Sequence, residues 1–295
     1  MKRWMVCLCA AITATGCEKN INLNLNKQAP VLVVDAQIEN GKAPVVVLST
    51  SLDYFSSISP QQLEQTFVHN AKITVSDGST TTQLEEFSET DSAGFKIYLY
   101  TSNPGLPGNI KGAFNTKYHL DITTEGGDTY SATTTIPALA KTLDSLWWKP
   151  APDNPDTTRC VMFGLFTDPK GYGNYIRYFT RVNSGPFLTA ANSAFDDEFT
   201  DGSTYSLQFD MGHDKGIITD NNDDIGFAHR GDTVTVKFCN IDKATYDFWR
   251  TWEFAYQSTN NPFSSPVVVQ GNISNGALGA FSGYAAEYKT IIIPN

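Results

Sequence analysis

The sequence predicts a mainly β protein: an immunoglobulin-like antiparallel β-sandwich followed by a second β-rich domain that contains one long aromatic helix. Three observations lead to this class. Short runs rich in Val, Ile, Thr and Tyr recur along the chain with turn residues between them, which is typical of antiparallel sandwiches. Only one long segment has the features of a helix. A Pro- and Asp-rich stretch near residue 150 separates two sets of strands, as a domain boundary does.

Residues 1–16 have the order of a secretory signal, because Lys2 and Arg3 precede an apolar stretch that is too short to span a bilayer. The stretch ends in "ATGC", which resembles the cleavage site of bacterial lipoproteins. We therefore expect Cys17 to become an acylated N-terminus that holds the protein on a membrane. The alternative is an ordinary secretory signal cut nearby, with Cys17 as a free thiol. The polar, Asn-rich residues 17–29 are predicted to form a tether.

Residues 30–138 are predicted to form the immunoglobulin-like sandwich. A short helix is expected after Ser59, since Pro60 suits the first helical position and Gln62 completes a capping box. Two glycines within "TEGGDTY" predict a hairpin turn between the last two strands. Because β-branched and aromatic residues dominate them, strands are expected at 31–38, 44–52, 71–77, 95–101, 117–124 and 129–136.

Residues 139–295 are predicted to form the second β-rich domain. Its helix should lie near 243–258, after the N-cap Asp242, because this run contains neither Gly nor Pro. The helix is aromatic over a wide arc, which indicates burial on both flanks. A Gly-rich turn is expected over 274–283, and strands are expected at 160–168, 174–182, 205–211, 232–241, 266–273 and 289–294.

The chain is acidic, with a net charge of -10, and loss of Lys2 and Arg3 with the leader takes this to about −12. Such a surface repels nucleic acid and anionic lipid. No segment after the leader is long and apolar enough to cross a bilayer. We therefore expect a soluble body whose contact with the membrane is its lipid, and no nucleic-acid partner.

Two cysteines, Cys160 and Cys239, remain in the body after cleavage and acylation. Both lie in strand-like runs. They can form a disulfide if the two strands are neighbours, and two buried free thiols are the equally supported alternative.

Aromatic side chains are the best candidates for a binding surface. Trp147 and Trp148 are adjacent in an extended segment, so their side chains point in opposite directions and one of them is expected to be exposed. Tyr172 and Tyr175 lie on or beside the Pro- and Gly-containing loop "DPKGYGN". These four residues are predicted to contact a ligand or a partner. The tryptophans of the predicted helix are expected in the core.

Acidic clusters offer a weaker signal for a cation. Asp220, Asn222 and Asp224 imitate the opening of a calcium-binding loop, but Ile225 stands where such a loop needs glycine. Solvated acidic turns are the favoured interpretation, here and in "FDDEF". We expect no metal and no cofactor, with Ca²⁺ as the alternative.

Motifs of catalysis are absent from the sequence: it has no GxSxG elbow, HExxH, P-loop or dinucleotide-binding fingerprint. The four histidines are scattered. We predict no catalytic residue and a function in binding. The alternative is a hydrolase whose residues converge from separate loops and include His213 or His229.

Motifs along nearly the whole body resemble one family, the Bacteroidota lipoproteins grouped as domain of unknown function 4249. They are "CEKNINLNL", "PVLVVDAQIENG", "VVVLSTSLDYF", "DPKGYGNYIRYFTRV", "GDTVTVKFCNID" and "NPFSSPVVVQGNISNGALGAFSGY". The family has no established chemistry. Its genes commonly neighbour TonB-dependent receptors, so the resemblance implies an outer-membrane lipoprotein that assists such a transporter in nutrient uptake. The resemblance does not determine whether the protein faces the periplasm or the cell surface. A structural or adhesive surface protein is the alternative.

Overall fold

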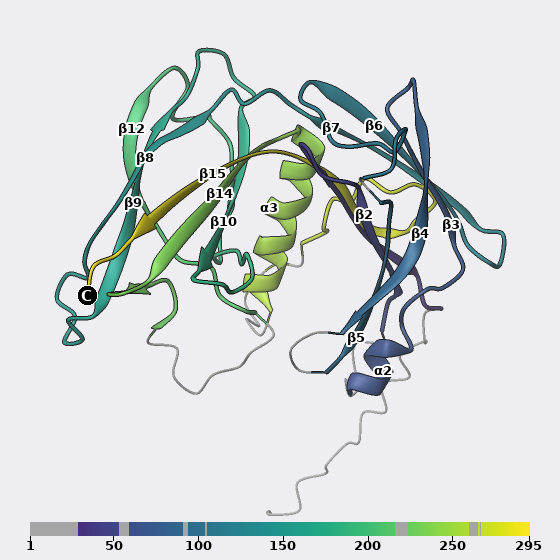
Figure 1. Cartoon of the computed structure of the whole chain (residues 1–295), viewed down its shortest axis with the longest axis horizontal. Helices are drawn as coiled ribbons and strands as arrows, with labels where there is room; N and C mark the ends of the chain where they lie inside the picture. The colour runs from purple at the N-terminus through teal and green to yellow at the C-terminus, as the bar shows by residue number, and fades with distance from the viewer. Residues whose placement is uncertain are drawn as a thin grey trace, which may run out of the picture.

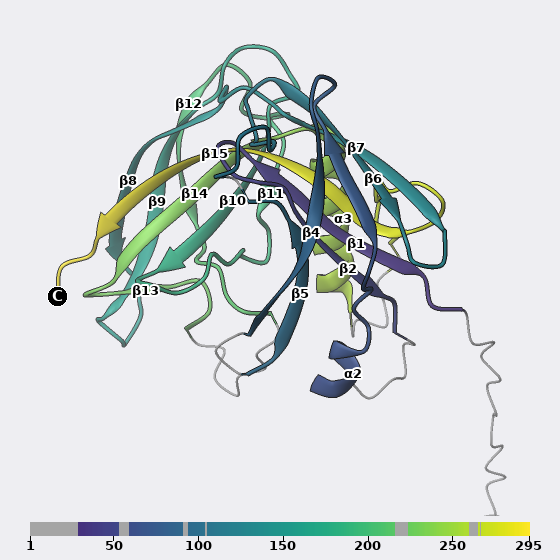
Figure 2. The same ribbon diagram turned by 45° about the vertical axis from the view of Figure 1, so that its right-hand side comes forward.

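The computed structural model describes residues 29–52, 59–90, 94–103, 105–215, 224–259, 265 and 267–295. In these ranges the protein is mainly β with one long helix, so the predicted class is confirmed (Figures 1 and 2). Cys17, Asp220 and Asn222 lie outside the described residues. The acylation of Cys17 therefore stays a prediction.

The first unit is a β-sandwich that is closed by a strand from the far end of the chain. Helix α2 begins after Ser59, and the predicted capping box between Ser59 and Gln62 is present. The elements of this unit are β1 (Leu32–Glu39), β2 (Val45–Thr50), α2 (Pro60–Glu64), β3 (Lys72–Ser76), β4 (Thr81–Thr90), β5 (Lys96–Thr101), β6 (Thr116–Thr123) and β7 (Thr129–Ile136).

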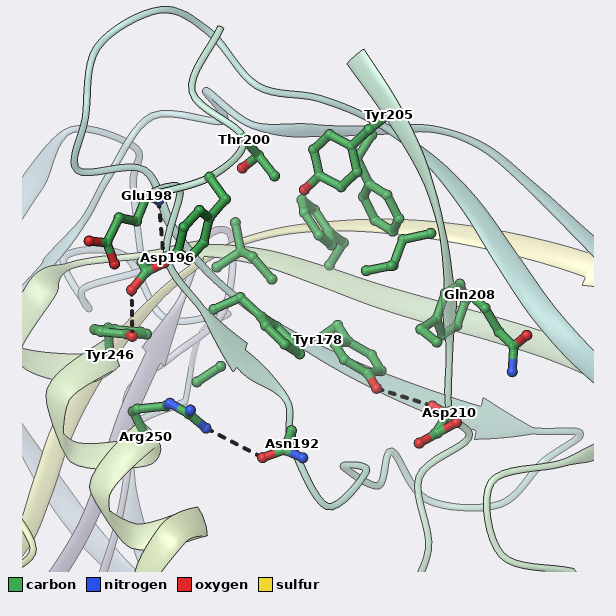
Figure 3. Close-up of a pocket in the computed structure, with 18 of the residues that line it drawn as sticks. Tyr178, Asn192, Asp196, Glu198, Thr200, Tyr205, Gln208, Asp210, Tyr246 and Arg250 are labelled. Atoms are coloured by element: carbon green, nitrogen blue, oxygen red, sulfur yellow. Dashed lines mark hydrogen bonds between the residues drawn. The ribbon is translucent and has the colours of Figure 1, made fainter. Parts of the chain in front are cut away.

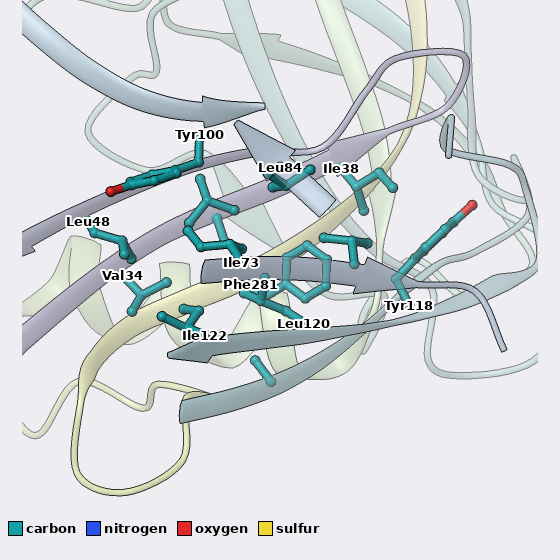
Figure 4. Packing of buried hydrophobic residues seen from close by; sticks show 14 of the residues in the cluster. Val34, Ile38, Leu48, Ile73, Leu84, Tyr100, Tyr118, Leu120, Ile122 and Phe281 are labelled. Carbon is teal, nitrogen blue, oxygen red and sulfur yellow. The ribbon is translucent and has the colours of Figure 1, made fainter. Parts of the chain in front are cut away.

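Strand β4 connects the two layers of this sandwich. Its first residues pair with β3 and its remaining residues pair with β5. The core between the layers consists of alternate, inward-pointing residues of the strands, and Figure 4 shows ten of them by name: Val34, Ile38, Leu48, Ile73, Leu84, Tyr100, Tyr118, Leu120, Ile122 and Phe281.

Strand β15 (Leu278–Ile292) belongs to both units. Its first half pairs in parallel with β1, and its second half pairs antiparallel with β14 (Thr233–Ile241). An 11-stranded sheet results, in the order β11-β10-β14-β15-β1-β2-β5-β4-β3-β6-β7. Figures 1 and 2 show β15 passing above the long helix from one unit to the other. The predicted boundary at residue 138 falls between β7 and β8, while the sheet itself is continuous.

Two expectations near the C-terminus are wrong. The stretch 274–283, expected as a turn, enters β15 at Leu278. Its small residues permit this because neighbouring backbones come close: a Cβ on Gly283 would lie 2.6 Å from the carbonyl oxygen of Thr135. Residues 267–273, expected within a strand, have no regular secondary structure.

The second unit places a smaller sheet against the β11-β10-β14-β15 end of the large one. In this sheet β9 pairs with β8 on one side and with β12 and β13 on the other. The remaining elements are β8 (Thr142–Pro150), β9 (Arg159–Thr167), β10 (Tyr175–Val182), β11 (Ala194–Phe195), β12 (Thr204–Phe209), β13 (Ala228–His229) and α3 (Lys243–Ser258).

Helix α3 occupies the predicted residues and is fixed to both units. Its N-cap Asp242 accepts hydrogen bonds from the backbone N–H of Thr245 at 2.9 Å and from that of Thr135 in β7 at 2.7 Å. The two flanks are not equally buried, since Phe248 is covered and Phe254 is half exposed to solvent. Within the described ranges, no helix combines the length and the apolar character that crossing a membrane requires.

A buried polar network holds α3 against β10. The Glu253 carboxylate accepts hydrogen bonds from the backbone N–H and the hydroxyl of Ser193. The Arg177 guanidinium donates to the same hydroxyl at 3.2 Å and to the Tyr284 hydroxyl at 2.8 Å. It also lies 3.4 Å from the centre of the Trp249 ring. This network explains why Arg177 and Glu253 can both be buried, since buried charges need partners.

Candidate functional site

A pocket of about 780 Å³ lies between the two sheets of the second unit (Figure 3). Strands β9 and β12 form one wall, β10, β11 and β14 form the other, and α3 contributes Tyr246 and Arg250. The strands line it with alternate residues, as the pleat of a sheet requires. On β12 these are Tyr205, Leu207 and Phe209, and Gln208 of the same strand also lines the pocket.

The interior of the pocket is aromatic. The Phe166 ring lies 5.5 Å from that of Phe238 and 5.6 Å from that of Tyr205, measured between centroids. The Tyr178 ring lies 5.5 Å from that of Phe209. Burial raises the pKa of Tyr178, whose hydroxyl donates to the main-chain carbonyl of Asp210 at 3.2 Å. These ring contacts fix the positions of the aromatic side chains that line the cavity.

Polar side chains surround the mouth of the pocket, the part of its lining that faces solvent. The Tyr246 hydroxyl donates to Asp196 at 2.8 Å, and Arg250 donates to the Asn192 side-chain carbonyl at 3.4 Å (Figure 3). Burial, and then the hydrogen bond to Asp196, raise the pKa of Tyr246 to about 12. Phe199 also lines the pocket, and its side chain is 94% exposed.

The turn that carries Phe199 is anchored by Asp197, two residues earlier in the chain. The buried Asp197 carboxylate accepts hydrogen bonds from the backbone N–H groups of Gly173 at 3.1 Å and Asn174 at 3.0 Å. Burial raises the pKa of Asp197, but these hydrogen bonds outweigh burial and lower it overall. Of the acids of "FDDEF", Asp197 therefore joins this turn to the loop "DPKGYGN".

A buried ion pair lies directly behind the pocket wall. The Lys141 ammonium contacts the Asp168 carboxylate at 2.7 Å, and both side chains are almost fully buried. The hydroxyl of Thr200, a lining residue, accepts from Lys141 at 3.0 Å and donates to Asp168 at 2.8 Å. These charges fix the end of the turn that forms the mouth.

The four aromatic residues predicted to bind do not converge on this pocket. Trp147 stacks on Phe163 with ring centroids 5.8 Å apart, and Trp148 packs against the core, so both are half-buried. Tyr172 is 77% exposed on its loop. Tyr175 comes nearest, because its ring stacks at 4.8 Å on that of the lining residue Tyr246.

Sequence reasoning missed the pocket itself. Its residues come from five strands, a turn and the helix, and alternate apolar residues of a strand look the same whether they meet a facing side chain or an open space. The one available signal was Phe199, a large aromatic residue inside an acidic turn.

Asp224, the described member of the predicted cation-binding set, already pairs with a basic side chain. One ligand atom each of Asp156, Asp224 and His229 lie within 4.8 Å of one another. The Arg159 guanidinium donates to Asp224 at 2.7 Å and lies 3.7 Å from Asp156. Because an arginine supplies the positive charge in this cluster, its geometry gives no argument for a metal.

The histidines of the hydrolase alternative are not among the residues that line the large pocket. His213 lines a smaller cavity of about 130 Å³, which shares Gln208 and Asp210 with the pocket. Burial, and then the charge of Lys215, lower the pKa of His213. His229 lies 3.4 Å from Asp224 in the cluster around Arg159.

Cys160 and Cys239 are both buried and unpaired, and they lie on different sheets. The structure therefore agrees with the alternative of two buried free thiols. Burial raises the pKa of Cys160 and raises that of Cys239 to about 12.

We expect the native protein, as residues 18–295, to resist thiol labelling. Burial raises the pKa of both thiols and so disfavours the reactive thiolate, and the core excludes the reagent. Dithionitrobenzoate should react with neither thiol in buffer and with both in guanidinium. Absence of reactive thiols in guanidinium would show that a disulfide has formed.

The fold and the pocket define a two-unit β protein whose second unit carries an aromatic pocket. The family described as Domain of unknown function (DUF4249) matches residues 18–290. The chain therefore belongs to this family, as its motifs predicted, and the match covers both units. None of the curated proteins compared with the chain matches it.

Proposed function

We propose that this protein is an acyl-anchored outer-membrane lipoprotein that binds a small ligand in the pocket of its second unit and assists a TonB-dependent transporter. The pocket is the observation that carries the binding role. Its volume of about 780 Å³ lies in the range of small-molecule sites, roughly 300–1,000 Å³, and such sites combine apolar walls with a few polar groups. The first unit follows the tether directly and stands nearer the membrane in this arrangement.

The chemistry of the pocket favours binding over catalysis. Among its described lining residues there is no histidine, cysteine, lysine or serine, so of the common catalytic acids, bases and nucleophiles it offers chiefly carboxylates and tyrosines. The carboxylates are at the mouth, and the interior consists of rings and aliphatic chains. Such a lining can hold and orient a molecule.

Removal of Phe199 tests the pocket. We expect residues 18–295 to bind the neutral fluorophore N-phenyl-naphthylamine and to enhance its emission. Phe199→Ala should weaken this binding by up to about tenfold, because an aromatic contact contributes about 0.5–1.5 kcal/mol. A fluorescence titration measures the affinity.

Phe114→Ala is the matched control, since Phe114 is 42% exposed and lies in the first unit. It should leave the affinity unchanged. Lack of binding by the unaltered protein, or equal affinities for both variants and the parent, would refute the binding role of the pocket.

Purification from native outer membranes tests the anchor and the transporter. A C-terminally tagged chain, extracted in a mild detergent that preserves known complexes, should carry acyl chains on Cys17 and retain a stoichiometric transporter. Cys17→Ser should move the protein to the soluble fraction. Recovery of the lipoprotein alone would refute the transporter partnership without affecting the test of the pocket.

A further inference from the structure

The mouth of the pocket has an excess of negative charge. Its described lining includes the carboxylates of Asp196, Glu198 and Asp210 and one basic side chain, Arg250. Arg250 donates to the neutral amide of Asn192. The net charge of -10 of the whole chain adds to the negative electrostatic potential at the mouth. A ligand that enters here passes a surface that attracts cations and repels anions.

Asp210 is a carboxylate of this lining that can receive a cationic group. Asp196 already accepts the Tyr246 hydroxyl. Asp210 is held through its main chain, whose carbonyl accepts the Tyr178 hydroxyl, while no described residue donates a hydrogen bond to its carboxylate. The side chain is exposed. It lies where the pocket and the smaller cavity meet (Figure 3).

No basic side chain of the described residues forms an ion pair with Asp210. His213, its titratable neighbour in the smaller cavity, has a lowered pKa because it is buried and because Lys215 lies near, and both effects disfavour a positive charge on its ring. The Lys215 ammonium keeps its charge but donates to the main-chain carbonyl of Thr189 at 3.0 Å and to its hydroxyl at 2.7 Å.

The interior of the pocket suits the apolar part of the same ligand. Aromatic rings form its walls, and the Tyr205 hydroxyl points inward between them (Figure 3). Flat ring systems gain most from such walls, because offset stacking adds to the burial of apolar area. Aromatic faces also attract cations. The ring of Tyr178, whose hydroxyl donates to the main-chain carbonyl of Asp210, therefore also favours a positively charged ligand.

We propose that the ligand is a small molecule with an apolar ring system and a cationic amine, in which the rings fill the pocket and the amine pairs with Asp210. Because this ligand class presupposes that the pocket binds, it rests on the proposed function. Anionic amphiphiles are disfavoured by the mouth and by the charge of the chain. Neutral ring compounds bind through the interior alone.

Three probes with the same ring test this ligand class: naphthylmethylamine, naphthylmethanol and naphthoic acid. Titration calorimetry with residues 18–295 at neutral pH and low salt should give affinities in the order amine, alcohol, acid. The amine should bind at least about tenfold more tightly than the acid, as expected for one charge pair at a partly hydrated site. Asp210→Asn should reduce this ratio to below about threefold.

Asp128→Asn is the matched control, because it removes an exposed carboxylate from a hairpin of the first unit. It should keep the order and the ratio. Equal affinities for amine and acid, or an unchanged ratio in Asp210→Asn, would refute the ligand class while binding of the alcohol upholds the proposed function. If none of the three probes binds, the proposed function itself fails.

Discussion

Replacing Lys141 by methionine is expected to lower the free energy of unfolding by about 3–5 kcal/mol. The ion pair of Lys141 with Asp168 measures 2.7 Å and is shielded from water. Methionine fills a similar space but leaves the carboxylate buried, with the hydroxyl of Thr200 as its only side-chain partner among the described residues. One oxygen of Asp168 already lacks a hydrogen bond among the described residues. Guanidinium unfolding followed by tryptophan fluorescence measures the loss.

Two further variants isolate the cause. Lys243→Met removes an exposed pair with Asp247, four residues along α3, and should cost no more than about 0.5 kcal/mol. Combining Lys141→Met with Asp168→Leu should recover much of the stability, because the unpaired charge is then gone. A Lys141→Met protein as stable as the parent would contradict the buried pair.

Gly279→Ala is the second change with a large expected effect. Gly279 has a φ of +100° and faces Val34 in the parallel pairing of β15 with β1. A Cβ at this position would overlap the carbonyl oxygen of Val34. Backbone strain and steric overlap each cost about 1–3 kcal/mol. We expect a clear fall in the midpoint of thermal unfolding, measured by circular dichroism.

Gly276→Ala separates strain from overlap. Gly276 lies three residues before Gly279, has a φ of +75°, and a Cβ there would have no atom within 4 Å. This variant should lose only the strain energy, about 1–2 kcal/mol. If both alanine variants have the same stability, the close approach of β1 and β15 at Gly279 is wrong.

The elements with a strong local signal were predictable. Helix α3 was found with its residues because Asp242 and the uninterrupted run after it give both a start and a pattern. Strand β4 was missed because most of its residues face solvent and several are polar. Strand β8 was missed because its end lies in the Pro-rich stretch, where Trp147 and Trp148 pair with Phe163 and Met162 of β9.

The pairing of strands that are distant in the sequence could not be predicted from local sequence patterns. The small residues at the start of β15 are typical of a turn, and they form a strand only because β1 supplies a partner from the opposite end of the chain. The candidate site also depends on contacts between residues that are distant in the sequence. The pocket is lined by residues of separate strands, such as Tyr178, Phe209 and Phe238. The sequence of any one strand does not indicate that a space remains between them.

The shared strand β15 also sets the order of events during folding. Val33 to Glu39 of β1 receive their parallel partner only when Leu278 to Tyr284 are present, so the first unit stays incomplete until nearly the whole chain has been made. Contacts between such distant residues slow folding, because a large loop must close before they form. Neither unit therefore has all of its strand pairs until β15 has been made, and a chain that lacks β15 has an open sheet edge in both units, a site of aggregation.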